Sequence, residues 1–362
     1  MAISAHQRLG RSFLGAAFAL ALIASPAQAA PVGAVDTGPC VAFDALGYRY
    51  IAFGRSGIAE PGIYLATNRS GAWRLSAHPI TPGQRCAGML VDADRHVHLL
   101  AVDRGTFDPD LGSAHLRYVT NRSGSWRASQ VYIGEIGFAT LGLGRTGRPS
   151  VAVYDQNGYF VFERTGAGSW AMRIVGDGLI SHMWPDRSGA LWLLAVGLDR
   201  HRPLFRITDR SGAWDISRVT QPYSGIRDIE FAIDRSGNRF LYAYDEATGK
   251  VGVFRADGTS WTFVGRTRTQ PGRLLREAVI EPGGAPHLML LVDRTRTEWG
   301  IVDMNKHDGV WHTQLIGYGS PYADLAIDGR GRVAATFDRD GVVWSYWNDW
   351  KGPVHRFRVS DL

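Results

Sequence analysis

The sequence predicts an all-β protein, a seven-bladed β-propeller of four-stranded antiparallel blades, on three observations. A heptapeptide recurs as TNRSGAW, TNRSGSW and TDRSGAW at residues 67–73, 120–126 and 208–214. Its last position recurs at intervals of 43 to 53 residues along the chain. Short strand-like segments bounded by turns fill each interval. A period in the forties is typical of four-stranded units arranged radially, so each interval predicts one blade.

The position of the heptapeptide tryptophan counts the blades. It is occupied in turn by Trp73, Trp126, Trp170, Trp214, Trp261, Trp311 and, by alignment, Val354. The glycine supplies the backbone angle of a hairpin turn into the outermost strand, and the tryptophan covers the packing between blades. The motif is therefore expected to be structural, and the final segment HRFRVS (355–360) is expected to form the outer edge of blade 7.

The first turn and the second strand of each unit also recur. The second strands read HLLAVD, SVAVYD, LYAYD, LMLLVD and AATFD, and their short length and their content of β-branched and aromatic residues favour strand over helix. Asp and Gly close tight turns through side-chain capping and positive φ. The first turns are DALG at Asp44, DADR at Asp92, DRSG at Asp186, DRSG at Asp234, EPGG at Glu281 and DGRG at Asp328.

The N-terminus predicts a secretory signal peptide over residues 1–29, followed by a single propeller domain over 30–362. A basic region with Arg8 and Arg11 precedes an apolar run at 13–24 and small residues at 27–29. The apolar run is shorter than the roughly 20 residues that a membrane-spanning helix needs, so no membrane span is expected. The predicted location is secreted or periplasmic.

The net charge and the cysteine content limit the classes of partner and of metal site. Loss of Arg8 and Arg11 with the leader lowers the formal net charge from +6 to +4, and no basic run with interleaved aromatics suggests nucleic acid. The two cysteines, Cys40 and Cys86, are expected to form a disulfide in a chain that leaves the cytosol. The cysteine spacings of zinc sites are absent.

The recurring G-x-W turn, in TNRSGAW, TNRSGSW and GAGSW, resembles the Asp-box (BNR-type) repeats of the sialidase superfamily and related secreted seven-bladed propellers. The resemblance covers roughly residues 38–362. Asp-boxes carry two residues between the glycine and the tryptophan, and only ADGTSW (256–261) keeps that spacing here; no R-I-P motif occurs. Such propellers include glycosidases, polysaccharide lyases, lectins and interaction platforms, so the resemblance implies the fold and leaves the activity open.

The polar segments between blades differ from one another, whereas the turns repeat. This predicts one asymmetric site near the axis, on the face built by the inter-blade loops. The expected centre of the site is His182, Arg227, Arg273, Arg276 and Tyr322, with His78 at its margin and Tyr223 and Asp228 among the ligand-binding candidates.

Those residue types suit an acidic ligand, because arginines fix carboxylates and His182, His78 or Tyr322 can move a proton. The first hypothesis is a secreted monomer that binds a carbohydrate or another extracellular ligand. A polysaccharide lyase or glycoside hydrolase acting on an acidic polysaccharide is the first alternative, and a protein-interaction propeller is the second. The alternative without any site is that these loops are solvated and vary because nothing constrains their sequence.

No cofactor is expected. Calcium at Asp108 and Asp110 is the metal alternative, although D-P-D is also a common turn. The chain has no GxSxG, HExxH or P-loop motif, so serine hydrolase, zincin and nucleotide chemistry have no support.

Overall fold

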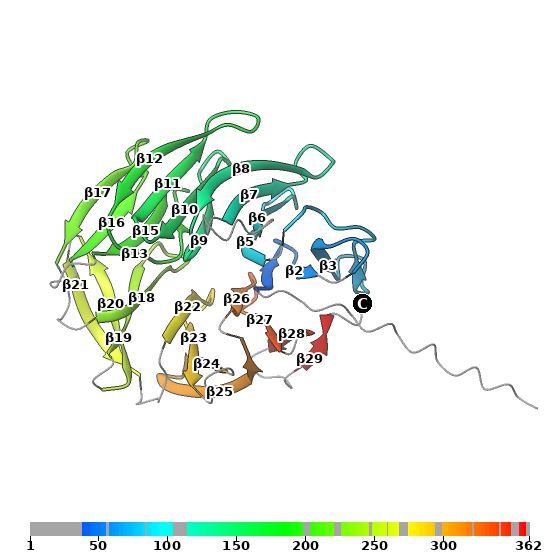
Figure 1. Cartoon of the computed structure of the whole chain (residues 1–362). Coiled ribbons are helices and arrows are strands. Elements are labelled where there is room, and N and C mark those ends of the chain that lie inside the picture. Colours follow the sequence, from blue (N-terminus) through cyan, green and yellow to red (C-terminus); the bar gives the residue numbers. More distant parts are fainter. Residues whose placement is uncertain are drawn as a thin grey trace, which may run out of the picture. The chain divides into compact units, whose positions relative to one another are not determined.

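The computed structural model describes residues 38–359 except 56–57, 84, 104–113, 198–202, 221–225, 246–247, 259, 268–273, 294–298, 321, 340–341 and 349–354. Within these ranges the chain forms strands and no α-helix, and the strands make seven antiparallel sheets set radially around a centre (Figure 1). This confirms the predicted fold class. The predicted signal peptide lies outside the described residues and stays a prediction.

Each blade is one contiguous stretch of chain, and its strands run in order from the innermost to the outermost. Blade 1 contains β1 (Cys40–Phe43), β2 (Arg49–Arg55), β3 (Gly62–Thr67) and β4 (Arg74–Leu75). Blade 2 contains β5 (Arg85–Val91), β6 (Val97–Asp103), β7 (Ala114–Thr120) and β8 (Arg127–Gly134). Blade 3 contains β9 (Phe138–Leu143), β10 (Pro149–Asp155), β11 (Gly158–Arg164) and β12 (Trp170–Gly176).

The remaining blades follow the same order. Blade 4 contains β13 (Leu179–Ile180), β14 (Trp184–Pro185), β15 (Leu191–Val196), β16 (Leu204–Thr208) and β17 (Asp215–Val219). Blade 5 contains β18 (Ile226–Ile233), β19 (Arg239–Asp245), β20 (Lys250–Asp257) and β21 (Ser260–Arg266). Blade 6 contains β22 (Leu274–Ile280), β23 (Pro286–Asp293), β24 (Trp299–His307) and β25 (Val310–Gly319). Blade 7 contains β26 (Asp324–Ile327), β27 (Val333–Arg339), β28 (Val342–Asn348) and β29 (His355–Arg358).

The innermost strand of blade 4 is interrupted. β13 and β14 both pair with β15, and residues 181–183 lie between them. The backbone of this gap is held by other groups, because Ser181 N donates to Leu194 O and Met183 N donates to Thr140 Oγ1, each at 2.9 Å. The sequence predicts an inter-blade loop at 175–186, whereas the structure places two short strands within that segment, with His182 in the gap between them.

The core lies between adjacent blades. Strands such as β6 and β15 are buried on both faces, as expected for middle layers of a stacked array. The six heptapeptide-slot tryptophans are each partly buried against a different hydrophobic cluster. Gly71, Gly124 and Gly212 have φ of 86°, 83° and 88°, which is the left-handed region that the turn requires. The structural interpretation of the heptapeptide is therefore confirmed.

Cys40 and Cys86 form a disulfide between β1 and β5, with their Cα atoms 5.7 Å apart, as predicted. The two ends of the described chain meet at the contact between blades 1 and 7. There Val41 N donates to Asp324 Oδ2 at 2.7 Å, and Arg332 Nη2 donates to Gly47 O at 2.9 Å. β29 pairs with β28 as the outer edge of blade 7, which confirms the position predicted for the final segment.

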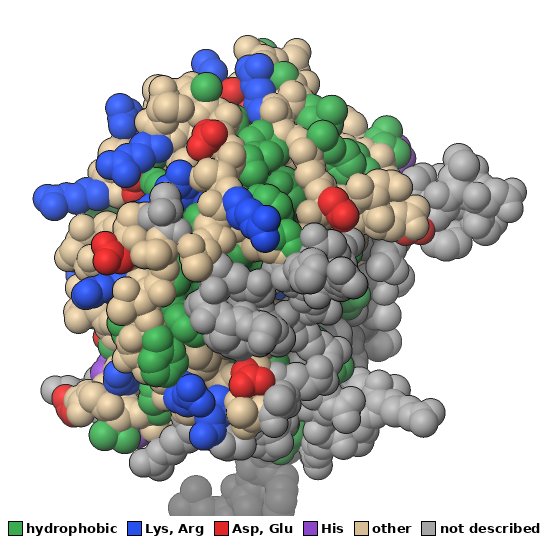
Figure 2. Space-filling view, turned by 90° about the vertical axis from the view of Figure 1, so that its left-hand side faces the viewer, with side chains coloured by type: hydrophobic (Ala, Val, Ile, Leu, Met, Phe, Trp, Pro, Cys, Tyr) green, Lys and Arg blue, Asp and Glu red, His purple; other side chains and the backbone are tan. Residues whose placement is uncertain are grey.

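The outermost strands face outward. Their exposed large apolar side chains include Ile133, Met172, Val175, Ile216, Phe263 and Val264. Figure 2 shows hydrophobic side chains between separated basic and acidic ones on one side of the molecule. Among the described residues there is no helix with the length and apolar character to cross a membrane.

Candidate functional site

A hollow of about 50 Å³ lies where the chain enters the innermost strands of the blades. Its polar and aromatic lining includes Arg85, Phe138, His182, Arg276 and Tyr322. These side chains come from blades 2, 3, 4, 6 and 7, so five separate parts of the sequence contribute to one place. We call this space the axial hollow.

Local irregularities of the inner strands position two of these side chains. His182 lies in the gap between β13 and β14. Arg276 is the extra residue of a register shift between Leu275 and Glu277 in the pairing of β22 with β23. Bulges of this kind re-aim a side chain out of the regular alternation, and they are frequent beside functional sites.

His182 is held by a carboxylate and a phenyl ring. Its Nδ1 lies 2.9 Å from Glu230 Oε2, and its Nε2 lies 4.0 Å from Glu277 Oε1. The ring packs edge-on against Phe138, with 5.0 Å between ring centroids. The Glu230 contact orients the imidazole, and 22% of the His182 side chain remains exposed.

Two further carboxyl groups are buried beneath His182. Glu277 Oε2 accepts a hydrogen bond from Leu325 N at 2.7 Å, and its side chain also bonds to that of Asp324. Burial, together with the negative charges of Asp324 and Glu230, raises the pKa of Glu277 well above its ordinary value. Burial also raises the pKa of Asp324. Both carboxyl groups therefore favour the neutral form more than an exposed carboxyl group does.

A larger axial cavity of about 340 Å³ continues from the axial hollow. His182 and Asp324 border both spaces, and Glu277 lines the larger one. Most of the remaining lining is apolar, with Met89, Leu141 and Trp184 among it. The polar groups of the axis are thus concentrated near the level of His182.

The other predicted site residues are placed as follows. His78 is exposed, contacts Glu60 at 2.8 Å and does not line the axial hollow. Asp228 belongs to β18, on the innermost strand of blade 5 and not in a loop. Arg227 lies on the same strand, but its side chain is outside the described residues. The positions outside the described residues altogether are Asp108, Asp110, Tyr223 and Arg273.

Sequence reasoning missed Glu230 as a site residue. It lies within IRDIEFAI, the segment of β18, and is 5% exposed. An acid at the centre of an innermost strand is the signal that was present, because a buried carboxylate needs a partner. Arg85 and Phe138 were not among the predicted site residues, because the contribution of blades 2 and 3 is visible only in three dimensions.

The structure also has a cavity of about 390 Å³ in blade 5, lined by residues that include Lys250, Phe254, Phe263 and Arg266. It is larger than the axial hollow, but all of its lining belongs to one blade, and the lining contains one acid, Asp245, and no histidine. We therefore place the candidate chemistry at the axial hollow.

No family model matches the sequence, and no curated protein matches it. Solved structures do match the fold. Virginiamycin B lyase from Staphylococcus aureus is 14% identical with a TM-score of 0.54, over 86% of this chain and 92% of that one. A streptogramin B lyase is 10% identical with a TM-score of 0.56, over 87% and 94%. A proposed 6-phosphogluconolactonase from Bacteroides uniformis is 14% identical with a TM-score of 0.59, over 85% and 94%. At these identities the likeness shows a shared fold alone.

Proposed function

We propose that this chain binds a small acidic ligand, most simply a saccharide that carries a carboxylate, at the axial hollow. The observation that carries the proposal is convergence. His182, Arg276 and Tyr322 come from three segments that do not repeat between blades, and all three line one hollow. Residues that serve the fold of a blade recur with the period, whereas these residues do not recur.

The size of the hollow limits how such a ligand would sit. A space of about 50 Å³ admits a carboxylate group but not a whole sugar ring, so the ring would rest on the rim. Arg276 offers the planar, charge-assisted donors that a carboxylate prefers. Tyr322 offers an aromatic face, and the guanidinium of Arg85 already lies 5.0 Å from its ring centroid.

The buried acids do not prevent anion binding. The raised pKa of Glu277 favours its neutral form and so lessens the negative charge beside the hollow. The carboxylate of Asp324 accepts a hydrogen bond from Val41 N, and that of Glu230 contacts His182 Nδ1. Arg85 and Arg276 supply positive charge above them. The hollow therefore favours an anionic ligand over a cationic one.

Calorimetric titration of the mature protein with uronate oligosaccharides and with neutral oligosaccharides of the same length tests the proposal. Replacing Arg276→Gln should weaken uronate binding about tenfold or more, because a hydrogen bond to a charged group contributes roughly 1.5–3 kcal/mol. Arg127→Gln, on the exposed outer strand β8, is the matched control and should bind as the wild type does. Equal affinity of the Arg276 variant for every ligand that binds would refute the assignment.

A second candidate function is proton abstraction by His182, favoured by the 2.9 Å contact of its Nδ1 with Glu230. A carboxylate on one ring nitrogen orients the other as a general base. In an elimination, Nε2 would take the proton from the carbon beside the carboxylate. The electrons of that C–H bond form a C=C bond, the C–O bond on the next carbon breaks, and the leaving oxygen takes a proton from water.

Incubation with a panel of acidic and neutral polysaccharides distinguishes the two functions. Absorbance from unsaturated uronates that is lost in His182→Asn would establish elimination, and new reducing ends without that absorbance would indicate hydrolysis. Binding without either product leaves the chain as a non-catalytic carbohydrate-binding propeller.

We further propose that residues 1–29 are removed on secretion and that residues 30–362 act as one domain. The Cys40–Cys86 disulfide supports this location, because such bonds persist in oxidising compartments. The mass of protein recovered from the periplasm or medium tests the cleavage position.

A further inference from the structure

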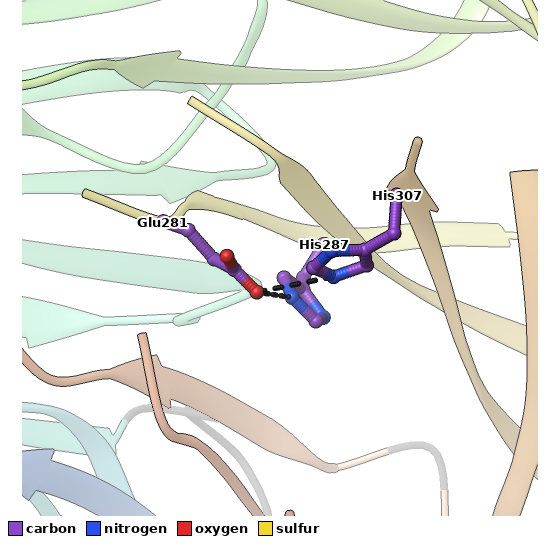
Figure 3. A group of neighbouring side chains, drawn as sticks. All are labelled: Glu281, His287 and His307. Atoms are coloured by element: carbon purple, nitrogen blue, oxygen red, sulfur yellow. Dashed lines mark hydrogen bonds and ion pairs between the residues drawn. The ribbon is translucent and has the colours of Figure 1, made fainter. Parts of the chain in front are cut away.

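Blade 6 carries a second cluster of ligand-type side chains. Glu281 follows β22, His287 lies near the start of β23, and His307 ends β24 (Figure 3). Glu281 Oε1 lies 2.8 Å from His287 Nε2 and 3.2 Å from His307 Nε2. One ligand atom from each of the three lies within 4.8 Å of those of the other two. The cluster belongs to the end of the blade that carries the first turns, so it is separate from the axial hollow.

The propeller repeat supplies internal controls for this cluster. In three other blades the acid of the first turn bonds to a ring six residues later along the chain. Tyr50 Oη lies 3.3 Å from Asp44, His98 Nε2 lies 3.2 Å from Asp92, and Trp192 Nε1 lies 3.0 Å from Asp186. The Glu281–His287 pair occupies the same positions. The acid–ring pair alone is therefore part of the scaffold and does not indicate a site.

His307 is the departure from the repeat. Where blades 1, 2 and 4 read T-N-R-S-G or T-D-R-S-G, blade 6 reads N-K-H-D-G at residues 305–309. His307 thus takes the slot that holds Arg69, Arg122 and Arg210 in the other blades, and a metal ligand replaces a permanent cation.

A tighter turn brings His307 to the cluster. The strands β3, β7 and β16 end at the threonine of the heptapeptide, whereas β24 continues through His307. Asp308 and Gly309 form the two-residue turn that follows, with φ of 51° and 77°. Positive φ at both positions is the type I′ geometry that joins two strands directly. His307 therefore stands on a strand beside His287, and the two rings pack edge to face at 5.8 Å.

Asp303 contacts His287 on the ring nitrogen that does not face Glu281. Both of its carboxylate oxygens lie 3.1 Å from His287 Nδ1, and its side chain is 2% exposed. In metal sites a carboxylate at this position fixes the tautomer of the ligating histidine and raises its basicity. The corresponding positions of blades 1, 2 and 4 are Leu65, Tyr118 and Arg206, so this acid too is particular to blade 6.

We infer that Glu281, His287 and His307 bind one transition-metal cation of the Zn²⁺ class, with Asp303 supporting His287. Two imidazole nitrogens and one carboxylate oxygen suit zinc, which takes a fourth ligand from water in such sites, and they disfavour calcium and magnesium. Tetrahedral coordination with bonds near 2.0–2.1 Å separates ligand atoms by about 3.3 Å. The 2.8 and 3.2 Å contacts need to open only slightly to admit the ion.

A proton competes for the same place. Burial lowers the pKa of His287, but Asp303 and Glu281 outweigh it and raise that pKa to about 9. In the metal-free protein the imidazole therefore donates from both nitrogens to the two carboxylates. The cation would replace the proton between His287 Nε2 and Glu281. The alternative to the metal site is thus a cluster that holds a proton only.

Equilibrium dialysis of the EDTA-treated mature protein against ZnCl₂ at pH 8 tests the inference, with thermal unfolding as a second measurement. The wild type should bind one equivalent of zinc and gain thermal stability. His307→Arg, which restores the residue of blades 1, 2 and 4 and can pair with Glu281, should fold and lose this equivalent. Asp303→Asn should weaken binding about 10–100-fold.

His96→Ala is the matched control. Asp92, Asp94 and His96 form the other group of metal-ligand spacing among the residues that the structure describes, and that group contains a single histidine. The control should keep the equivalent of zinc. Co²⁺ should give the intense visible absorption of a four-coordinate centre in the wild type and in the control, and not in His307→Arg. Absence of stoichiometric zinc in the wild type, or its retention in His307→Arg, would overturn the assignment in favour of the proton-holding cluster.

Discussion

The two ends of the propeller differ in what the repeat preserves. At the axial hollow, His182, Arg276 and Tyr322 come from blades 4, 6 and 7, and each of these blades contributes a different residue. At the first turns, the acid–ring pair recurs in blades 1, 2, 4 and 6. Residues that recur stabilise the blade that carries them, whereas residues that occur once, in several different blades, together line one hollow. Substitutions at the turns should therefore cost stability, and substitutions at the hollow should cost binding.

The disulfide should be an exception to this division. It borders the axial hollow, and yet its removal should lower stability. Cys40 and Cys86 are 46 residues apart, and the chain-entropy model assigns a loop of that size about 4 kcal/mol. We expect Cys40→Ser/Cys86→Ser to lower the free energy of unfolding by an amount that approaches this value. Urea unfolding followed by tryptophan fluorescence measures it. A loss below about 1 kcal/mol would show that packing alone holds blades 1 and 2 together.

Removal of a turn acid should confirm the stability role of the turn end. Asp186 accepts hydrogen bonds from Ser188 N at 2.8 Å, Ala190 N at 3.1 Å and Trp192 Nε1 at 3.0 Å. Asp186→Ala leaves these donors without that acceptor, so we expect a loss of about 2 kcal/mol and unchanged uronate affinity. Asp186→Asn keeps an acceptor and should cost less. A change in affinity at unchanged stability would contradict the comparison.

The smallest expected effect is a pH dependence of stability caused by Glu277 beside the hollow. Because the folded-state pKa of Glu277 is raised, the folded protein binds more protons than the unfolded chain above pH 4.5. Stability is therefore lost as the pH rises from 4.5 through the raised pKa. Glu277→Gln removes this loss, since its amide can donate to Asp324 and accept from Leu325 N.

The stability difference between Glu277→Gln and the wild type should thus be near zero at pH 4.5 and grow with pH. Thermal unfolding of both proteins across that range measures it, with Glu163→Gln as the control, because Glu163 lies far from the hollow and its partly exposed carboxylate pairs with Arg173. A difference that does not vary with pH would mean that the pKa of Glu277 is not raised in the folded protein.

The heptapeptide predicted the number of blades and the packing of its tryptophans because it acts within a few residues of chain. The two cysteines predicted their pairing because no other thiol competes. His182, Arg276 and Tyr322 were candidates because they lie where the repeat fails, and all three line the axial hollow.

The remaining contacts of the two candidate sites depend on how strands and blades are placed in space, which no local sequence pattern encodes. Glu230 reads as one polar residue in an apolar strand until the gap in the innermost strand of blade 4 brings His182 to it. His307 reads as a turn residue until the two-residue turn after it extends β24. In both cases a single irregularity of the backbone decides which side chains meet.

The way the described chain closes its ring has a mechanical consequence. Every blade is built from consecutive strands, so blades 1 and 7 meet side by side and exchange no strand within the described residues. The contact depends on packing among Ile51, Phe53, Ala334, Val343 and Val359 and on hydrogen bonds such as that from Val41 N to Asp324. Tension applied to the two ends would load this junction directly, whereas blades 1 and 2 are joined covalently. The junction between the first and last blades is therefore the natural place for the ring to open, and a circular permutant cut between two other blades would move that weak point elsewhere.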